Sequence, residues 1–158
     1  FMSLETFVST AEDQVGNDGS KYQEWYGSSD SWCAMFVSWC ANEAGILTTE
    51  DTAAPPFVKK EAYVPTMRDW YNDNHRAFTI SSSPTSANYP QPGDLVTIRP
   101  TKTGKDHSHI GIVVETDGNK IITIEGNCRN EVKRVTYTDG FRSGYGTLLW
   151  VLSNHTSW

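Results

Sequence analysis

The feature that most constrains the fold is the order in which two apolar patterns follow each other along the chain. Up to about residue 75, apolar residues recur at the helical spacing of 3.6 residues in segments 4–15, 33–44 and 65–75. After Gly93, short runs of Val, Ile and Thr are typical of strands. These runs cover residues 94–100, 109–116, 120–126, 131–138 and 147–153. Segregated helices and strands predict an α+β fold, with N-terminal helices packed on a C-terminal antiparallel β-sheet.

Length and linker content indicate how many domains the chain forms. At 158 residues it has the size of one domain and is long enough to bury a core. The polar segment 81–94 is too short to be a domain linker, and no internal repeat is present. We therefore expect residues 1–158 to form one monomeric domain, either a whole protein or a domain cut from a longer one.

The charge balance excludes some classes of partner. The formal net charge is −6, so the chain would gain nothing from counterion release on nucleic acid. The sequence has no run of 18 apolar residues, the length that a membrane-spanning helix needs. We expect neither a nucleic-acid partner nor a membrane span.

Three cysteines, Cys33, Cys40 and Cys128, are an odd number, so at least one thiol is free. In one helix, Cys33 and Cys40 would lie roughly 10.5 Å apart along its axis, which is too far for a disulfide. Spacing alone leaves open a pairing of Cys128 with either of them.

Cys33 is the candidate nucleophile because it would lie in the first turn of its helix. The positive end of the helix dipole favours a thiolate at that position. Asp30 or Ser31 can cap the same helix. Cys40 lies two turns further along, on the packed face, and is expected to be structural. The alternative for Cys33 is an ordinary buried thiol, which is common among free cysteines.

A thiolate nucleophile needs a base, and His109 is the best placed of the four histidines. It opens the apolar segment 109–116, whereas His107 precedes it, His75 ends a polar helix and His155 lies near the C-terminus. The sequence predicts a hairpin turn at 116–119, and Glu125 lies about as far beyond that turn as His109 lies before it. Because cross-strand neighbours lie roughly 5 Å apart, Glu125 can orient the His109 ring. The alternative is an exposed acid at a strand end.

Four motifs together resemble the CHAP family of cysteine- and histidine-dependent amidohydrolases and peptidases. They are "WCAMFVSWCANEAG", "PGDLV", "HSHIGIVVE" and "IEGN", in the order of the family, and the resemblance runs from about Gly16 to Gly146. It implies a papain-like fold with Cys33 as nucleophile, His109 as base, and Glu125 and Asn127 completing the site. NlpC-type peptidases usually carry Asp-Cys at the nucleophile, so Trp32 before Cys33 favours CHAP.

The resemblance also implies a substrate and a place of action. The substrate would be bacterial peptidoglycan, cleaved at the sugar–peptide amide or within a stem or cross-bridge peptide. The protein would act on the cell wall after secretion or delivery by a phage. No cofactor would be required; calcium, which some relatives bind before the nucleophile, would have only Asn17, Asp18 and Asp30 as ligands.

Two other classes of function fit parts of the pattern. A zinc site could use His107, His109 and either Cys33 or Cys128, because His-x-His on a strand puts both rings on one face. No C-x-x-C or H-E-x-x-H motif accompanies them. A catalytically inactive wall-binding module could instead use the aromatic residues. The complete Cys-His-Glu set favours the enzyme over both.

Overall fold

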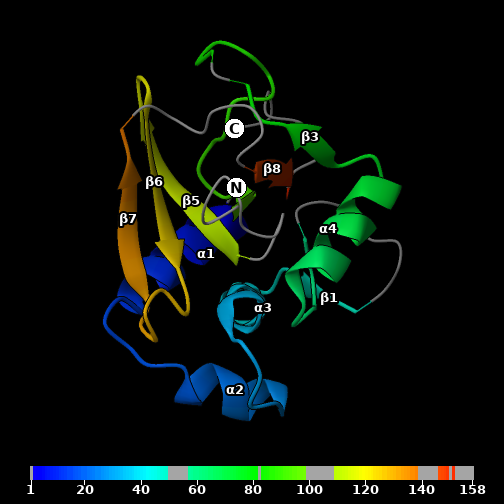
Figure 1. Cartoon of the computed structure of the whole chain (residues 1–158), viewed down its shortest axis with the longest axis vertical. Coiled ribbons are helices and arrows are strands. Elements are labelled where there is room, and N and C mark those ends of the chain that lie inside the picture. The colour runs from blue at the N-terminus through cyan, green and yellow to red at the C-terminus, as the bar shows by residue number, and fades with distance from the viewer. Residues whose placement is uncertain are drawn as a thin grey trace.

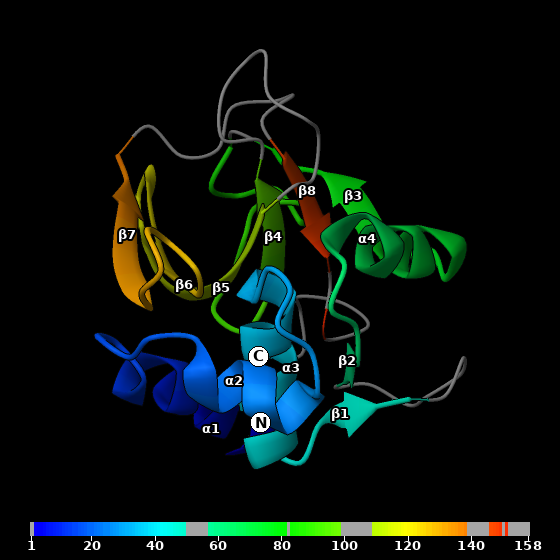
Figure 2. The ribbon, with the colours of Figure 1, turned by 60° about the horizontal axis from the view of Figure 1, so that its bottom comes forward.

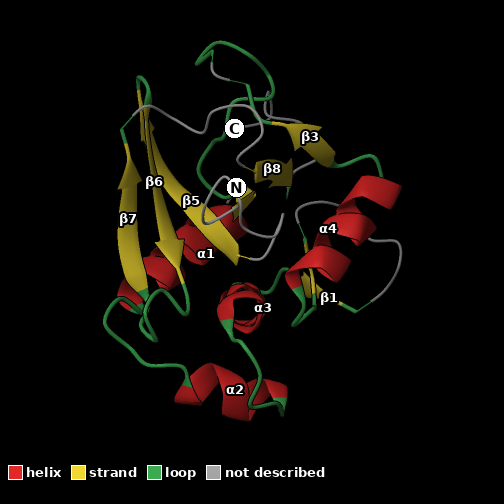
Figure 3. Cartoon of the chain, viewed as in Figure 1, coloured by secondary structure: helices red, strands yellow, loops and turns green. Residues whose placement is uncertain are grey.

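The computed structural model describes residues 2–49, 57–81, 83–98, 109–138, 146–149 and 151. Within these residues the helices are α1 (Met2–Asp13), α2 (Ser20–Tyr26), α3 (Cys33–Glu43) and α4 (Val64–Asp73). The strands are β1 (Leu47–Thr48), β2 (Val58–Lys59), β3 (Ala77–Thr79), β4 (Leu95–Ile98), β5 (His109–Asp117), β6 (Lys120–Glu125), β7 (Lys133–Tyr137) and β8 (Gly146–Leu149) (Figure 3). None of the described helices is long and apolar enough to cross a membrane.

One six-stranded antiparallel sheet extends across the molecule from β7 to β3 (Figure 1). Its strand order is β3-β8-β4-β5-β6-β7, and every neighbouring pair is antiparallel. β1 and β2 form a separate, short parallel pair. Figure 2 shows α1, α2 and α3 together on one side of the sheet, while α4 lies beside β3 and β8. The α+β fold expected from the sequence is therefore confirmed.

Strand alternation divides the apolar residues into two clusters. On the helix side, Phe7 of α1 and Phe36 of α3 belong to the same buried cluster as Ile110, Ile112 and Ile124 of the sheet. The other cluster is formed by residues that alternate with these along the strands, together with two from the segment before β4. Its members are Ile80, Tyr89, Val96, Ile98, Val113, Ile121 and Leu148. The sheet is thus buried on both faces where the strands are longest.

The β5–β6 hairpin contains an irregularity that matters for the site. The strands pair as Asp117↔Lys120 and Glu115↔Ile122 beside the turn, but as Ile112↔Ile124 further along. Val114 is therefore an extra residue in β5, a β-bulge that shifts the pairing by one residue. Gly118, with φ of 59°, lies in the turn that the sequence predicted.

The structure differs from the sequence expectation in its shorter elements. The segment between α1 and α3, expected to be a loop, contains α2, and the Asp18 carboxylate accepts hydrogen bonds from the backbone N–H and hydroxyl of Ser20 at its start. Strands β1, β2 and β3 precede Gly93 and were not predicted. These elements have only two to seven residues, so they carry too little periodicity for a pattern to be detected.

Candidate active site

Cys33 is the first residue of α3, as the sequence predicted, and only 3% of it is exposed. The N-cap residue is Trp32, and no side chain caps the helix, so the expectation that Asp30 or Ser31 would cap it was wrong. The Cys33 thiol thus lies at the positive end of the helix dipole. Cys40 is fully buried on the same helix, and burial raises its pKa well above the ordinary value, so it stays a neutral thiol.

The three cysteines are all free in the structure. Cys33 and Cys40 are buried, and Cys128 is partly exposed. The disulfide between Cys128 and another cysteine, which spacing had left open, does not form.

His109 and Glu125 form a buried pair on neighbouring strands. The imidazole Nε2 lies 2.9 Å from Glu125 Oε1, and the Glu125 side chain is 3% exposed against 19% for His109. The other carboxylate oxygen, Oε2, accepts hydrogen bonds from the hydroxyls of Thr123 at 2.6 Å and Tyr137 at 2.7 Å. Glu125 is therefore a buried and fully engaged carboxylate rather than an exposed strand-end acid.

The electrostatics of this pair favour a charged imidazole. Burial lowers the pKa of His109, but hydrogen bonds with Cys33 and Glu125 and the negative charge of both groups outweigh burial and raise that pKa to about 10. Burial raises the pKa of Glu125, but its hydrogen bonds, with His109 first, bring that pKa below the ordinary value. Because Glu125 engages Nε2, the other ring nitrogen, Nδ1, is the one left to interact with Cys33. The structure therefore brings the side chains of Cys33, His109 and Glu125 together.

The bulge at Val114 brings Glu125 within reach of His109. In the shifted register Glu125 lies opposite Gly111, and alternation puts its side chain on the same face as His109. Without the extra residue, Glu125 would lie opposite Ile112 and point to the other face. A Cβ atom at Gly111 would lie 2.9 Å from Glu125 Cγ, so the carboxylate crosses to His109 over the bare backbone of a glycine.

Three residues that support this pair were not identified from the sequence. Thr123 and Tyr137 donate to Glu125, and Gly111 leaves space for it. Burial and the charge of Glu125 raise the pKa of Tyr137, so its hydroxyl keeps its proton and remains a donor. Thr123 shares a face with Glu125 at i−2, which is the one sequence signal that could have indicated it.

Asn127 contacts the segment that precedes the candidate nucleophile. Its backbone has a positive φ of 57°, and its side-chain amide donates to Ser31 Oγ at 3.0 Å. Ser31 lies two residues before Cys33, so Asn127 contacts the segment that leads to the nucleophile. Its hydrogen bond goes to that segment and not to the His109 ring.

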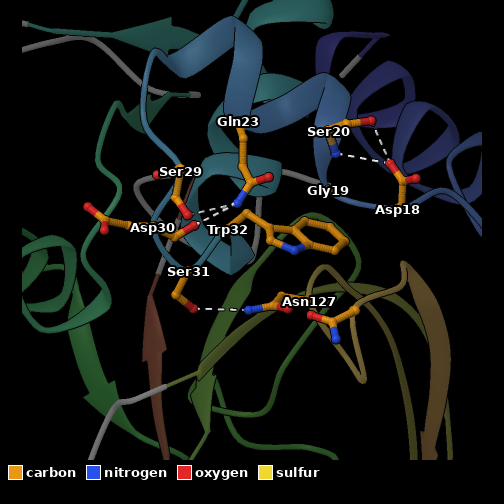
Figure 4. Close-up of a pocket in the computed structure, with 10 residues that line it drawn as sticks. Asp18, Gly19, Ser20, Gln23, Ser29, Asp30, Ser31, Trp32 and Asn127 are labelled. Atoms are coloured by element: carbon orange, nitrogen blue, oxygen red, sulfur yellow. Dashed lines mark hydrogen bonds between the residues drawn. The ribbon is translucent and has the colours of Figure 1, made fainter.

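A polar cavity of about 460 Å³ opens beside the start of α3. Its walls come from α2 and the loop before it, the loop before α3 and the loop after β6, and Figure 4 shows the Trp32 indole between Gly19 and Asn127. The lining residues are Asp18, Gly19, Ser20, Gln23, Ser29, Asp30, Ser31, Trp32, Asn127 and Asn130. The cavity thus joins the expected nucleophile segment to the loop that follows Glu125.

The structure describes the three residues suggested for calcium, but of the residues suggested for zinc it describes only Cys33, His109 and Cys128. Within the part of the chain that the structure describes, no three His, Cys, Asp or Glu side chains are arranged to hold a metal ion. Asp18 accepts from Ser20, Asp30 accepts from the Ser28 hydroxyl, and Asn17 donates to Gln14. The residues suggested for calcium are therefore engaged locally. His107 and His155 lie outside the described residues.

These features define an α+β domain in which a cysteine opens a central helix and faces a buried His–Glu pair on the sheet. The family model of the CHAP domain matches residues 25–127, so the chain belongs to the CHAP family and the resemblance seen in the sequence is confirmed. A comparison with curated protein sequences gave no match.

Two solved structures have a similar fold. The crystal structure of Ly7917 has a TM-score of 0.53 and 17% sequence identity, over 92% of this chain and 61% of that chain. The crystal structure of Ly7917 with the hydrolyzing product of MDP has a TM-score of 0.50 and 16% identity, over 92% of this chain and 62% of that chain. This chain therefore spans about three-fifths of the length of those proteins.

Proposed function

We propose that this protein is a cysteine-dependent hydrolase that cleaves amide bonds of bacterial peptidoglycan, with Cys33 as nucleophile, His109 as base and Glu125 as the residue that orients the base. The observation that carries the proposal is the buried Glu125–His109 pair, at 2.9 Å, beside a cysteine at a helix start. An activated nucleophile needs a base within reach and a third group that orients the base, and the Glu125–His109 pair supports that arrangement for Cys33.

The reaction follows from these positions. His109 accepts the Cys33 proton, and the charge of Glu125 stabilises the resulting imidazolium. The thiolate attacks the carbonyl carbon of the scissile amide, and the backbone N–H of Cys33 donates to the oxyanion. His109 then gives its proton to the amide nitrogen, the C–N bond breaks and the amine leaves. Water, activated by His109, hydrolyses the thioester and releases a carboxylic acid and the free thiol.

Family membership and a solved structure support the substrate class. Ly7917, similar to this chain in fold, was crystallised with the hydrolyzing product of MDP, which is a peptidoglycan-derived compound. The scissile bond would be the sugar–peptide amide or an amide within a stem or cross-bridge peptide. The polar cavity, lined by the residues that precede Cys33 in sequence, offers amide and hydroxyl groups to such a ligand. The protein would act on the cell wall as a monomer, after secretion or delivery by a phage.

The experiment that tests this function combines wall hydrolysis with identification of the products. We expect the wild type to clear suspensions of purified peptidoglycan from at least one bacterial source. Mass spectrometry of the soluble products then identifies the new amine and carboxylate, which distinguishes an amidase from an endopeptidase. Cys33→Ser should fold normally and release no product, whereas Cys40→Ala should remain active with some loss of stability. Hydrolysis by a folded Cys33→Ser protein would exclude the thiol mechanism.

The two alternatives predict different results in the same assay. A wall-binding module would sediment with peptidoglycan but release no fragments from any source. A metal-dependent hydrolase would lose activity to a similar extent in His107→Ala and His109→Ala, because both would be ligands. The thiol mechanism predicts that His109→Ala is inactive and that His107→Ala is only weakened.

A further inference from the structure

The segment that leads to the nucleophile, residues 28–32, has no helix cap to fix it, because no side chain caps α3. Hydrogen bonds and one aromatic stack hold it to α2. Gln23 Nε2 donates to the carbonyl oxygens of Ser29 at 3.2 Å and Asp30 at 2.9 Å, and the Trp32 ring stacks on Tyr22 with centroids 5.5 Å apart. These contacts fix the position of the segment relative to the helices. They do not fix the position of the segment relative to the sheet that carries His109 and Glu125.

The hydrogen bond between Ser31 and Asn127 supplies the connection to the sheet. Its atoms, Asn127 Nδ2 and Ser31 Oγ, lie 3.0 Å apart, and the two residues are 96 positions apart in sequence. Among hydrogen bonds between described residues, this is the one that joins segment 28–32 to the sheet or its loops. Ser31 lies two residues before Cys33, and Asn127 two residues after Glu125, so this bond connects the two halves of the candidate site (Figure 4).

The backbone of the loop after β6 is shaped for this contact. Asn127, Arg129 and Asn130 have positive φ angles of 57°, 57° and 63°, a conformation that costs energy in residues other than glycine. Gly126 packs so closely on α3 that a Cβ atom there would lie 2.6 Å from Phe36 Cβ. The loop therefore lies against the start of α3 in a conformation that the surrounding structure must hold in place.

We propose that Ser31 and Asn127 are positioning residues that act as one unit and align Cys33 with His109. The inference rests on the proposed function, since it assigns these residues a role in the same thiol chemistry. It differs from a role for Asn127 in contacting the substrate or the oxyanion. In that case Ser31 would be dispensable and Asn127 would act independently of it.

A double-mutant cycle separates the two roles. Ser31→Ala and Asn127→Ala should each lower the turnover rate on peptidoglycan by about three- to tenfold, the effect of losing one neutral hydrogen bond. The double variant should be no slower than either single variant, because both changes remove the same bond. Ser31→Thr, which keeps the hydroxyl, should retain most of the activity. Ser28→Ala is the matched control, because the Ser28 hydroxyl bonds to Asp30 within the same segment, and it should leave the rate unchanged.

Alkylation of Cys33 provides a second readout that needs no wall substrate. The rate of iodoacetamide labelling at Cys33, resolved by peptide mass spectrometry, reports how well His109 activates the thiol. Ser31→Ala, Asn127→Ala and the double variant should label more slowly by the same factor. A wild type that labels rapidly but hydrolyses no peptidoglycan would contradict the proposed function and leave this test of positioning intact. The positioning role is overturned if Ser31→Ala changes neither readout, or if the two single effects multiply in the double variant.

Discussion

At the scale of single residues, the environment of Glu125 explains how a carboxylate can be buried in an apolar strand. An isolated buried charge is costly, but Glu125 accepts hydrogen bonds from His109, Thr123 and Tyr137. Its charge in turn helps to raise the pKa of His109 to about 10, against the effect of burial. The three hydrogen bonds therefore keep the acid ionised. The imidazole is kept protonated by its interactions with Cys33 and Glu125.

Glu125→Gln should move the alkaline limb of the pH–activity profile to lower pH. The amide keeps the shape of the side chain but removes its negative charge, so the pKa of His109 falls and the imidazolium loses its proton sooner as pH rises. We also expect a loss of rate on the order of a hundredfold at neutral pH. Hydrolysis rates measured from pH 5 to pH 11 check both effects.

Two comparisons give that experiment its controls. Glu115→Gln removes an exposed carboxylate of the β5–β6 hairpin that pairs with Arg134 of β7, and it should leave the position of the alkaline limb unchanged. Asn127→Ala should shift the limb less than Glu125→Gln. A larger shift from Asn127→Ala would make Asn127 the residue that orients His109.

Tyr137→Phe should destabilise the fold and lower the activity moderately. The change leaves Glu125 Oε2 with one hydroxyl donor, Thr123, in place of two. Loss of a hydrogen bond to a charged group costs about 1–3 kcal/mol of unfolding free energy, which urea denaturation measures. Tyr63→Phe is the control, because Tyr63 is 64% exposed. Equal stability of the two variants would mean that the Tyr137 hydroxyl does not support Glu125.

At the scale of elements, the β5–β6 hairpin decides which side chains meet. The bulge at Val114 turns Glu125 to the face of His109, and Gly111 leaves the path between them open. Helix α3 contributes from the other layer by placing Cys33 at its first residue and burying Cys40 two turns later. The site therefore depends on one helix start, one bulge and one glycine.

Gly111→Ala should separate the His–Glu pair without unfolding the sheet. The new Cβ would lie 2.9 Å from Glu125 Cγ, so the Glu125 side chain must move. A displacement of that kind near a reacting group can cost on the order of a hundredfold in rate. Hydrolysis rates and near-ultraviolet circular dichroism check the two parts of this prediction.

A double variant shows whether the effect of Gly111→Ala passes through Glu125. In a Glu125→Ala background the closest remaining contact of the new methyl group is Thr123 Cβ at 3.3 Å. There Gly111→Ala should cause little further loss of rate or stability. If instead the two losses are independent, the glycine is needed for the sheet itself and not for Glu125.

At the scale of the whole molecule, two layers meet to form the site. The helices carry Cys33 and the sheet carries His109 and Glu125, and the polar cavity lies where the loops of both layers converge. The candidate calcium ligands on the helix side are engaged by hydrogen bonds within their own loops. The chemistry proposed for the site uses protons and a thiol alone.

Treatment with a chelator should therefore leave activity unchanged. We expect the same rate of peptidoglycan hydrolysis before and after dialysis against EDTA, and no gain on adding Ca²⁺ or Zn²⁺. The unfolding midpoint, measured in the same samples, separates a catalytic from a structural role of any metal. A loss of activity that Ca²⁺ restores would show that Asn17, Asp18 or Asp30 takes part in a site that the sequence only suggested.

The sequence by itself determined the features that depend on one segment at a time. The order of periodic patterns gave the α+β fold, and the position of a cysteine at a helix start and of a histidine at a strand start identified Cys33 and His109. The hairpin turn predicted that Glu125 lies near His109. Each of these inferences needs only local periodicity and the chemistry of a helix or strand end.

Only the tertiary structure decided which side chains meet. A shift of one residue in register turns Glu125 from one face of the sheet to the other, and no pattern in β5 predicts the extra residue Val114. Likewise, Asn127 donates to Ser31 across 96 positions, and Tyr137 reaches Glu125 from the neighbouring strand. Such contacts form only when segments that are distant in sequence pack together. The sequence of either element alone therefore does not predict them.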